Sequence, residues 1–225
     1  MQIAARLAVL GAMQQEKRLD VIANNIASAG VAGFRADDLK VSGFAEALTF
    51  ARMEPGPVRE TGVPLDVAIE GEGFFQVQTP QGLRYTRAGN FTLNAEGVLV
   101  TQGGHPVLGE GAPLTIERGT VRITEDGEVL DGADPVGRLT VTRFPAGTRM
   151  VKAEDGLLVP EDPRREPETA EEARLRQGAL EGANVNVVQE MTRMIASLRA
   201  FEACQKVLAS AREEDSQLVQ KLGDA

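Results

Sequence analysis

Cysteine, histidine, tyrosine and tryptophan are almost absent from this chain of 225 residues, which has one Cys, one His, one Tyr and no Trp. A single Cys excludes a disulfide framework and a zinc site built from several cysteines. A single His excludes a His-rich metal site and leaves His105 as the one histidine that could act in catalysis. Aromatic residues make up only 4% of the chain, so aliphatic side chains must form its core.

Basic charge and long apolar runs are also lacking. The chain has 24 Lys and Arg against 33 Asp and Glu, a formal net charge of −9. Nucleic-acid binding needs a basic surface, so we expect no nucleic-acid partner. No window approaches the roughly 18 apolar residues of a membrane span. Arg6 interrupts the mildly apolar N-terminus, so we expect neither a membrane span nor a cleaved signal peptide.

Glycine and proline are missing mainly from the two ends. All 11 prolines lie between Pro55 and Pro167, and most of the 24 glycines lie between residues 31 and 178. Both residues favour turns and are costly inside helices. The distribution predicts an α+β chain with an N-terminal helical segment over residues 1–30, a β-rich middle over 31–178 and a C-terminal helical segment over 179–225.

Apolar residues at alternating spacings of four and three predict one helix from Gln2 to about Ser28 and another from about Ala183 to Leu222. The first stripe contains Ile3, Leu7, Leu10, Gln14, Lys17, Val21 and Asn24, and the second contains Val187, Met191, Met194, Leu198 and Phe201. We expect the two helices to pair as an antiparallel coiled-coil stalk. Two helices cover only one seam each, so the remaining apolar surface invites other subunits.

The middle of the chain has the pattern of an antiparallel β domain. Short alternating runs separated by turn residues predict strands at 74–78, 83–87, 91–93, 98–101, 114–116, 121–124, 128–130 and 138–144. The segment from Glu161 to Arg176 is rich in charge and proline, and we predict a linker there.

Catalytic and metal-binding patterns are weak. The glycine pair at Gly71 and Gly73 precedes a predicted strand, whereas a phosphate cradle needs a helix N-terminus. The acidic run from Glu125 to Asp134 lacks the spacing of a calcium loop. His105 precedes a proline in a turn and has no nucleophile motif around it. We expect no enzyme activity and no catalytic, cofactor-binding or metal-binding residues.

Three collinear stretches carry a resemblance that spans the chain. They are VIANNIASAGVAGFR over 21–35, PLDVAIEGEGFF and YTRAGNF over 64–75 and 85–91, and LEGANVN over 180–186 with the helix that follows. The chain resembles the flagellar rod and hook family. Its short middle domain is most similar to the proximal rod members, the distal rod members are second, and the hook protein fits less well.

The resemblance implies a structural subunit of the bacterial flagellar basal-body rod, located in the periplasm and exported through the flagellar export apparatus. Its partners would be copies of itself and other rod proteins, with no cofactor and no small-molecule substrate. The terminal helices would form an inner layer, and the residues at the helix–β junction would set the turn of the chain. The expected assembly residues are Leu7, Leu10, Val21, Asn24, Asn25, Gly33, Phe34, Val187, Met191, Met194, Leu198 and Phe201.

Two other classes of protein remain open. One is a soluble ligand-binding or hydrolytic β domain with a helical oligomerisation stalk, which predicts a deep pocket with converging acids between residues 55 and 170. The other is a cytoplasmic coiled-coil adaptor, which would not co-purify with basal bodies.

Overall fold

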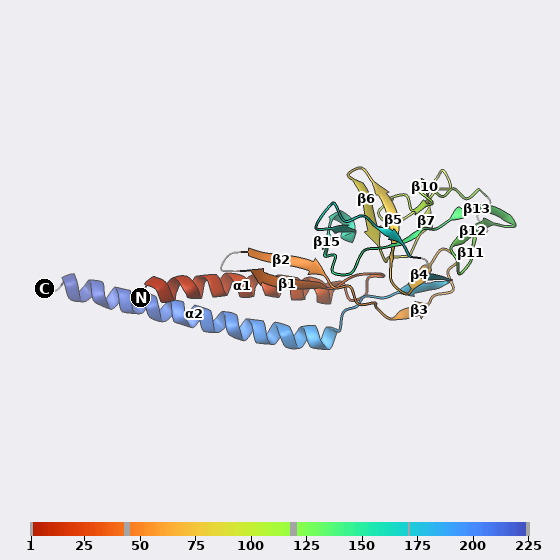
Figure 1. The fold of residues 1–225 in the computed structure, drawn as a ribbon. Helices are drawn as coiled ribbons and strands as arrows, with labels where there is room; N and C mark the ends of the chain where they lie inside the picture. Colours follow the sequence, from red (N-terminus) through yellow and green to blue (C-terminus); the bar gives the residue numbers. More distant parts are fainter. Residues whose placement is uncertain (1, 43–45, 118–120, 171, 224–225) are drawn as a thin grey trace. The chain divides into compact units, whose positions relative to one another are not determined.

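The chain forms two compact units in the computed structural model, which describes residues 2–42, 46–117, 121–170 and 172–223. The first unit contains the residues up to 27, residues 37–49 and those from 186 onward. The second contains residues 28–36 and 50–185. Helices dominate the first unit and antiparallel strands the second (Figure 1), so the predicted α+β fold is confirmed.

Two long helices form the first unit, α1 from Gln2–Ala27 and α2 from Val187–Gly223. They lie antiparallel along each other (Figure 1), which confirms the predicted pairing. A short hairpin of β1 (Asp37–Ser42) and β2 (Glu46–Ala51) accompanies them, with β1 against α1.

Helix α2 begins four residues later than the predicted start at Ala183. Asn186 caps it, because its side-chain Oδ1 accepts a hydrogen bond from the Gln189 backbone at 3.2 Å and its carbonyl accepts one from Glu190 at 2.9 Å. Asparagine at this position satisfies amide groups that have no partner within the helix. The residues before Asn186 are held in the β unit and cannot join the helix.

Small and polar residues occupy the buried positions of the helical unit. Ala8 and Ile22 of α1 are buried, as are Glu190 and Ser197 of α2. The helices approach closely where Gly11 faces Cys204, since a Cβ atom on Gly11 would lie 3.2 Å from the Cys204 Sγ. Cys204 is half-buried, as a small side chain in a helix seam should be.

Strands of the second unit pair in antiparallel ladders. The largest sheet has six strands in the order β15-β16-β6-β5-β14-β17. A three-stranded sheet β11-β12-β13 and the pairs β18-β4, β19-β3, β7-β8 and β10-β9 complete the unit. Their bounds are β3 Val58–Glu60, β4 Val67–Glu70, β5 Phe74–Thr79, β6 Gly82–Thr86, β7 Thr92–Leu93, β8 Leu99–Val100, β9 Leu108–Gly109, β10 Ala112–Pro113, β11 Val121–Ile123, β12 Glu128–Asp131, β13 Asp134–Arg138, β14 Val141–Arg143, β15 Met150–Lys152, β16 Leu158–Pro160, β17 Glu168–Thr169, β18 Arg174–Gln177 and β19 Ala179–Glu181.

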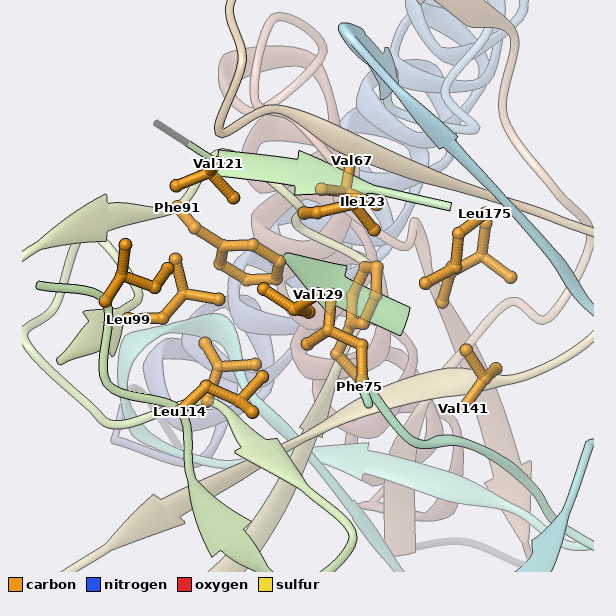
Figure 2. Close-up of a cluster of buried hydrophobic side chains, with 14 of the residues drawn as sticks. Val67, Phe75, Phe91, Leu99, Leu114, Val121, Ile123, Val129, Val141 and Leu175 are labelled. Atoms are coloured by element: carbon orange, nitrogen blue, oxygen red, sulfur yellow. The ribbon is translucent and has the colours of Figure 1, made fainter. Parts of the chain in front are cut away.

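The main core lies between these sheets (Figure 2) and consists almost wholly of aliphatic side chains. Phe75 and Phe91 meet edge to face at its centre, with ring centroids 5.0 Å apart. Strand β5 is covered on both faces. Phe75 and Val77 enter this core or lie buried beside it, and Phe74 points into a second cluster with Tyr85 and Met150.

One linker prediction and two strand predictions differ from the structure. The segment 161–176 is not simply a linker, because β17 and the start of β18 lie in it and Leu175 is buried in the core. Residues 114–116 form only an isolated antiparallel β-bridge, between Thr115 and Val98, rather than a strand; Leu114 and Ile116 are buried, and the local strand β10 ends at Pro113. The run 138–144 is divided between β13 and β14, because β13 pairs with β12 and β14 with β5.

Tyr85 allows a direct test of the second cluster. Burial raises the pKa of its phenol, and its ring lies edge to face with Phe144 at 4.8 Å. The folded state therefore favours the protonated phenol. This contribution to stability is complete below the unfolded pKa of about 10 and is lost as the pH rises through the folded pKa.

We predict that phenolate absorbance, which reports only Tyr85 in this chain, titrates at a higher pH in the native protein than in urea. As the pH rises above ~10, the free energy of unfolding should fall less in the Tyr85→Phe variant than in the wild type. Identical titration curves in native and unfolded protein would contradict the burial of this side chain.

Candidate functional site

The predicted assembly residues of the helices fall into two groups. Leu10, Val21, Val187, Met194 and Phe201 are half-buried. Leu7, Met191 and Leu198 are exposed, so they do not belong to the seam between α1 and α2. The inner seam of α2 follows the series of Glu190, Met194, Ser197, Phe201 and Cys204, which overlaps the predicted stripe at only two positions.

Asn25 fastens strand β1 to the end of α1. Its side-chain Oδ1 accepts a hydrogen bond from the Asp37 backbone N–H at 2.8 Å, and its Nδ2 donates to the Asp37 carbonyl at 2.9 Å. Asn24 Nδ2 also donates to the Asp37 carboxylate at 3.2 Å. Because Asn25 is buried and matches both backbone groups of one residue, it acts as a substitute for a neighbouring strand.

Gly33 lies directly against the backbone of the central signature stretch. Its φ of +64° is left-handed, and a Cβ atom would lie 2.1 Å from the Ala88 nitrogen. Only glycine fits both demands. The next residue, Phe34, is half-buried, and the Lys152 ammonium lies 3.6 Å from the centre of its ring.

Glu181 joins the three signature stretches through one buried carboxylate. Its Oε1 lies 2.6 Å from a terminal nitrogen of Arg35, and its Oε2 lies 2.7 Å from Nε of Arg87. The side chains of this ion triad are only 1–3% exposed. The backbone N–H of Gly56 also donates to Oε1 at 2.7 Å, and that of Gly33 donates to the Glu181 carbonyl at 2.7 Å.

Arg87 makes further contacts that fix its position. Its terminal nitrogens donate to the carbonyls of Gly73 and Gly71, both at 2.9 Å. Desolvation by burial lowers the pKa of Arg87 to about 10, against the opposing effect of the Glu181 carboxylate. A guanidinium with that pKa is still charged at neutral pH.

Asn184 ties the chain segments on either side of the triad. Its Oδ1 accepts from the Ala36 N–H at 2.6 Å, and its Nδ2 donates to the carbonyls of Arg52 and Glu54 at 3.1 and 2.7 Å. Its own backbone N–H donates to the Phe34 carbonyl at 3.2 Å. We call Gly33, Arg35, Arg87, Glu181 and Asn184 the junction clamp.

Sequence reasoning placed only Gly33 of the junction clamp among the expected assembly residues. Arg35, Arg87 and Glu181 were visible only as members of the three signature stretches. A usable signal was present, because each is a charged residue within two positions of a glycine in a stretch otherwise rich in small and apolar residues.

A cavity of about 850 Å³ lies in the second unit beside the triad. The alternative of a ligand-binding or hydrolytic domain predicted such a pocket, but it also required converging acids. Three of the five acids that line the cavity are bound to arginines: Glu70 to Arg176, Glu168 to Arg143 and Glu181 to the triad. The cavity therefore offers little of the acid–base chemistry that this alternative needs.

Among the residues that the structure describes, no group of three or more His, Cys, Asp or Glu side chains is placed to hold a metal ion. None of the helices in the described part of the chain is both long and apolar enough to cross a membrane.

A chain with paired terminal helices, a β domain and three separated signature stretches has the organisation of a structural subunit, and family models match each stretch. The model described as flagella basal body rod protein matches residues 6–35. The flagellar hook protein FlgE/F/G D1 domain matches residues 68–130, and the flagellar basal body rod FlgEFG protein C-terminal domain matches residues 176–221.

Whole-chain relatives support the same assignment. The flagellar basal-body rod protein FlgF of Caulobacter vibrioides is 37% identical, with 94% of each chain covered. FlgF of Salmonella typhimurium is 35% identical over 99% of each chain. FlgG of Agrobacterium fabrum is 31% identical over 93% of this chain and 95% of its own. The chain belongs to the flagellar basal-body rod protein family, as a structural subunit most like the FlgF members.

Gly33 provides the test of the junction clamp. We predict that Gly33→Ala lowers the free energy of unfolding by about 2–4 kcal/mol, because the new methyl group both strains a left-handed residue and collides with the Ala88 backbone. Gly30→Ala is the matched control, since nothing lies within 4 Å of its Cβ position. Urea unfolding should show the control within about 0.5 kcal/mol of wild type; equal stability of the two variants would contradict the close approach at Gly33.

Proposed function

We propose that this rod subunit assembles with copies of itself and with other rod proteins through its terminal helices. The apolar face of α2 that is not used inside the chain would contact neighbouring subunits along the axis. The β unit, which has its own core, would fold independently of that contact.

One observation carries the proposal: α2 has a second row of large apolar residues that lies outside the pair with α1. Val188, Met191, Ile195 and Leu198 are 74, 51, 55 and 44% exposed. Their spacing of three, four and three residues places them on one face, which we call the outer stripe. On α1, Leu7, Val9 and Met13 are exposed as well.

The inner seam is only partly apolar. Beside Met194 and Phe201 it contains small residues, Ala8, Gly11, Ser197 and Cys204, which bury little apolar area. The buried Gln15 Oε1 accepts no hydrogen bond from the residues that the structure describes. Burial of apolar area contributes about 25 cal/mol per Å². Covering the outer stripe would therefore add to the stability of α2, and this needs a second chain.

Location follows from the family and the proposed mode of assembly. The rod of the flagellar basal body is where members of this family act, and we place this subunit in its periplasmic part. We propose export through the flagellar export apparatus without a cleaved signal peptide. Weakly paired ends and a chain without disulfides suit passage in an unfolded state.

Leu198 tests the role of the outer stripe. We predict that Leu198→Asp weakens each subunit contact by more than about tenfold, because a buried leucine contributes about 1.5–3 kcal/mol and a buried carboxylate opposes association. Ala203→Asp is the control, since Ala203 is exposed on another face of the same helix. In a deletion strain, the gene for the Ala203→Asp control should restore motility and the gene for Leu198→Asp should not. Both purified chains should retain the β-sheet signal. Normal motility of the Leu198→Asp strain would refute the role of the outer stripe.

Limited proteolysis tests the proposed weakness of the helical pair in the free chain. We expect the first 27 residues and those after 187 to be cleaved well before the region from Pro55 to Pro167. Mass spectrometry of the fragments over time measures the order of cleavage. Ends as protected as the β unit would show that the helices are stable without neighbouring subunits.

A further inference from the structure

The junction clamp holds the two chain segments that lead to the helices. Gly33 lies six residues after the end of α1, and Glu181 lies six residues before the start of α2. A hydrogen bond joins the Gly33 N–H to the Glu181 carbonyl at 2.7 Å, and another joins the Asn184 N–H to the Phe34 carbonyl at 3.2 Å. The two segments therefore leave the second unit at a fixed offset from each other.

We propose that the Arg35–Glu181–Arg87 ion triad sets the register of α1 against α2. Glu181 acts here as a positioning residue, which determines through the chain which residues of the two helices face each other. We assign this register the purpose of aligning the outer surfaces of the two helices for assembly, and this purpose rests on the proposed function. The register itself is a property of the single chain.

The chemistry of the triad suits a positioning role better than a purely stabilising one. Charges removed from water lose hydration, and a buried ion pair is often no more stable than apolar side chains of the same size. Arg35 Nε, Arg87 Nε and Glu181 Oε2 are buried and make no hydrogen bond among the described residues, so the charges are not fully compensated. What the triad does provide is direction at Glu181 Oε1, which accepts hydrogen bonds from Arg35 and from the Gly56 N–H, while Oε2 lies in ion-pair contact with Arg87.

A shift of either segment by one residue would separate these groups. The shifted chain would bury a carboxylate or a guanidinium without its partner, which is among the most destabilising changes a protein core can undergo. Apolar side chains at the same positions would tolerate the shift, since their contacts are not directional. The triad thus selects one offset between the two segments.

The helices themselves provide part of the selection. Met194 and Phe201 contribute large apolar side chains to their seam, which also contains small residues at Ala8, Gly11 and Ser197. If one helix slid by a turn, Ala8 or Gln15 would take the place of Gly11 opposite Cys204. The clamp, which short segments join to both helices, adds a second constraint on the register.

Cys204 is the only cysteine in the chain and makes the register measurable. A cysteine at Gly11 would place its Cβ 3.2 Å from the Cys204 Sγ, which is within reach of a disulfide. Cysteines at Ala8 and Gln15 report slipped registers. The experiment compares disulfide yields of Gly11→Cys, Ala8→Cys and Gln15→Cys in the dilute, full-length monomer in a glutathione redox buffer.

With the triad intact, we expect Gly11→Cys to give at least about ten times the disulfide of either slipped probe. Glu181→Gln should reduce this selectivity to near one, since it removes the charge that orders both arginines. Asp126→Asn is the matched control, because it removes an exposed carboxylate of the same unit that pairs with Arg174. Arg35→Lys, which keeps the charge, should retain part of the selectivity.

Unchanged selectivity in Glu181→Gln with a folded β unit would overturn the proposal. If Glu181→Gln does not fold, the apolar replacement Arg35→Met, Glu181→Leu, Arg87→Met decides instead. We expect this triple variant to retain the β-sheet signal and lose the selectivity. Failure of the triple variant to fold would show that the triad is needed for stability and would also overturn the proposal. Because the readout is made on the monomer, either failure leaves the assembly role of the outer stripe to its own test.

Discussion

A single buried carboxylate, that of Glu181, holds the β unit to the segments through which the chain enters and leaves it. The two arginines that it binds come from stretches far apart in sequence, and Arg35 lies 146 positions away. Gly33 and Gly56 must lie close for their N–H groups to reach Glu181, and the Gly33 position leaves no room for a side chain beside Ala88. The three signature stretches of the family are therefore one structural feature.

The two units divide the work of a rod subunit between them. The β unit buries a continuous aliphatic core and is complete in itself (Figure 2). The helical unit leaves Val188, Met191, Ile195 and Leu198 uncovered and pairs through a seam that mixes large, small and polar residues. A chain with this distribution gains stability at its ends from neighbouring chains, which fits a protein that is exported first and ordered during assembly.

Local sequence patterns predicted the helices and part of the strands, and contacts between distant residues decided where α2 begins and which of its faces pairs with α1. Helix α1 and fewer than half of the strands from β3 to β19 followed from residue spacing and from the placement of glycine and proline; the strands are β5, β6, β7, β8, β11, β12 and β14. The start of α2 did not, because Asn184 is held by backbone groups at Ala36, Arg52 and Glu54. Strand β18 was hidden by its charges, since only Leu175 of its four residues is buried. The predicted stripe of α2 included Met191 and Leu198, because residue spacing identifies the most apolar face of a helix. In this chain α2 pairs with α1 through a different face.

The most direct test of the assembly account is electron cryo-microscopy of basal bodies at side-chain resolution, with attention to α2 of this subunit. The account predicts that the outer stripe of Val188, Met191, Ile195 and Leu198 lies buried against a neighbouring chain, while Gly11 and Cys204 of one chain remain face to face. An outer stripe that faces solvent in the assembled rod, with contacts made only by the β unit, would contradict it.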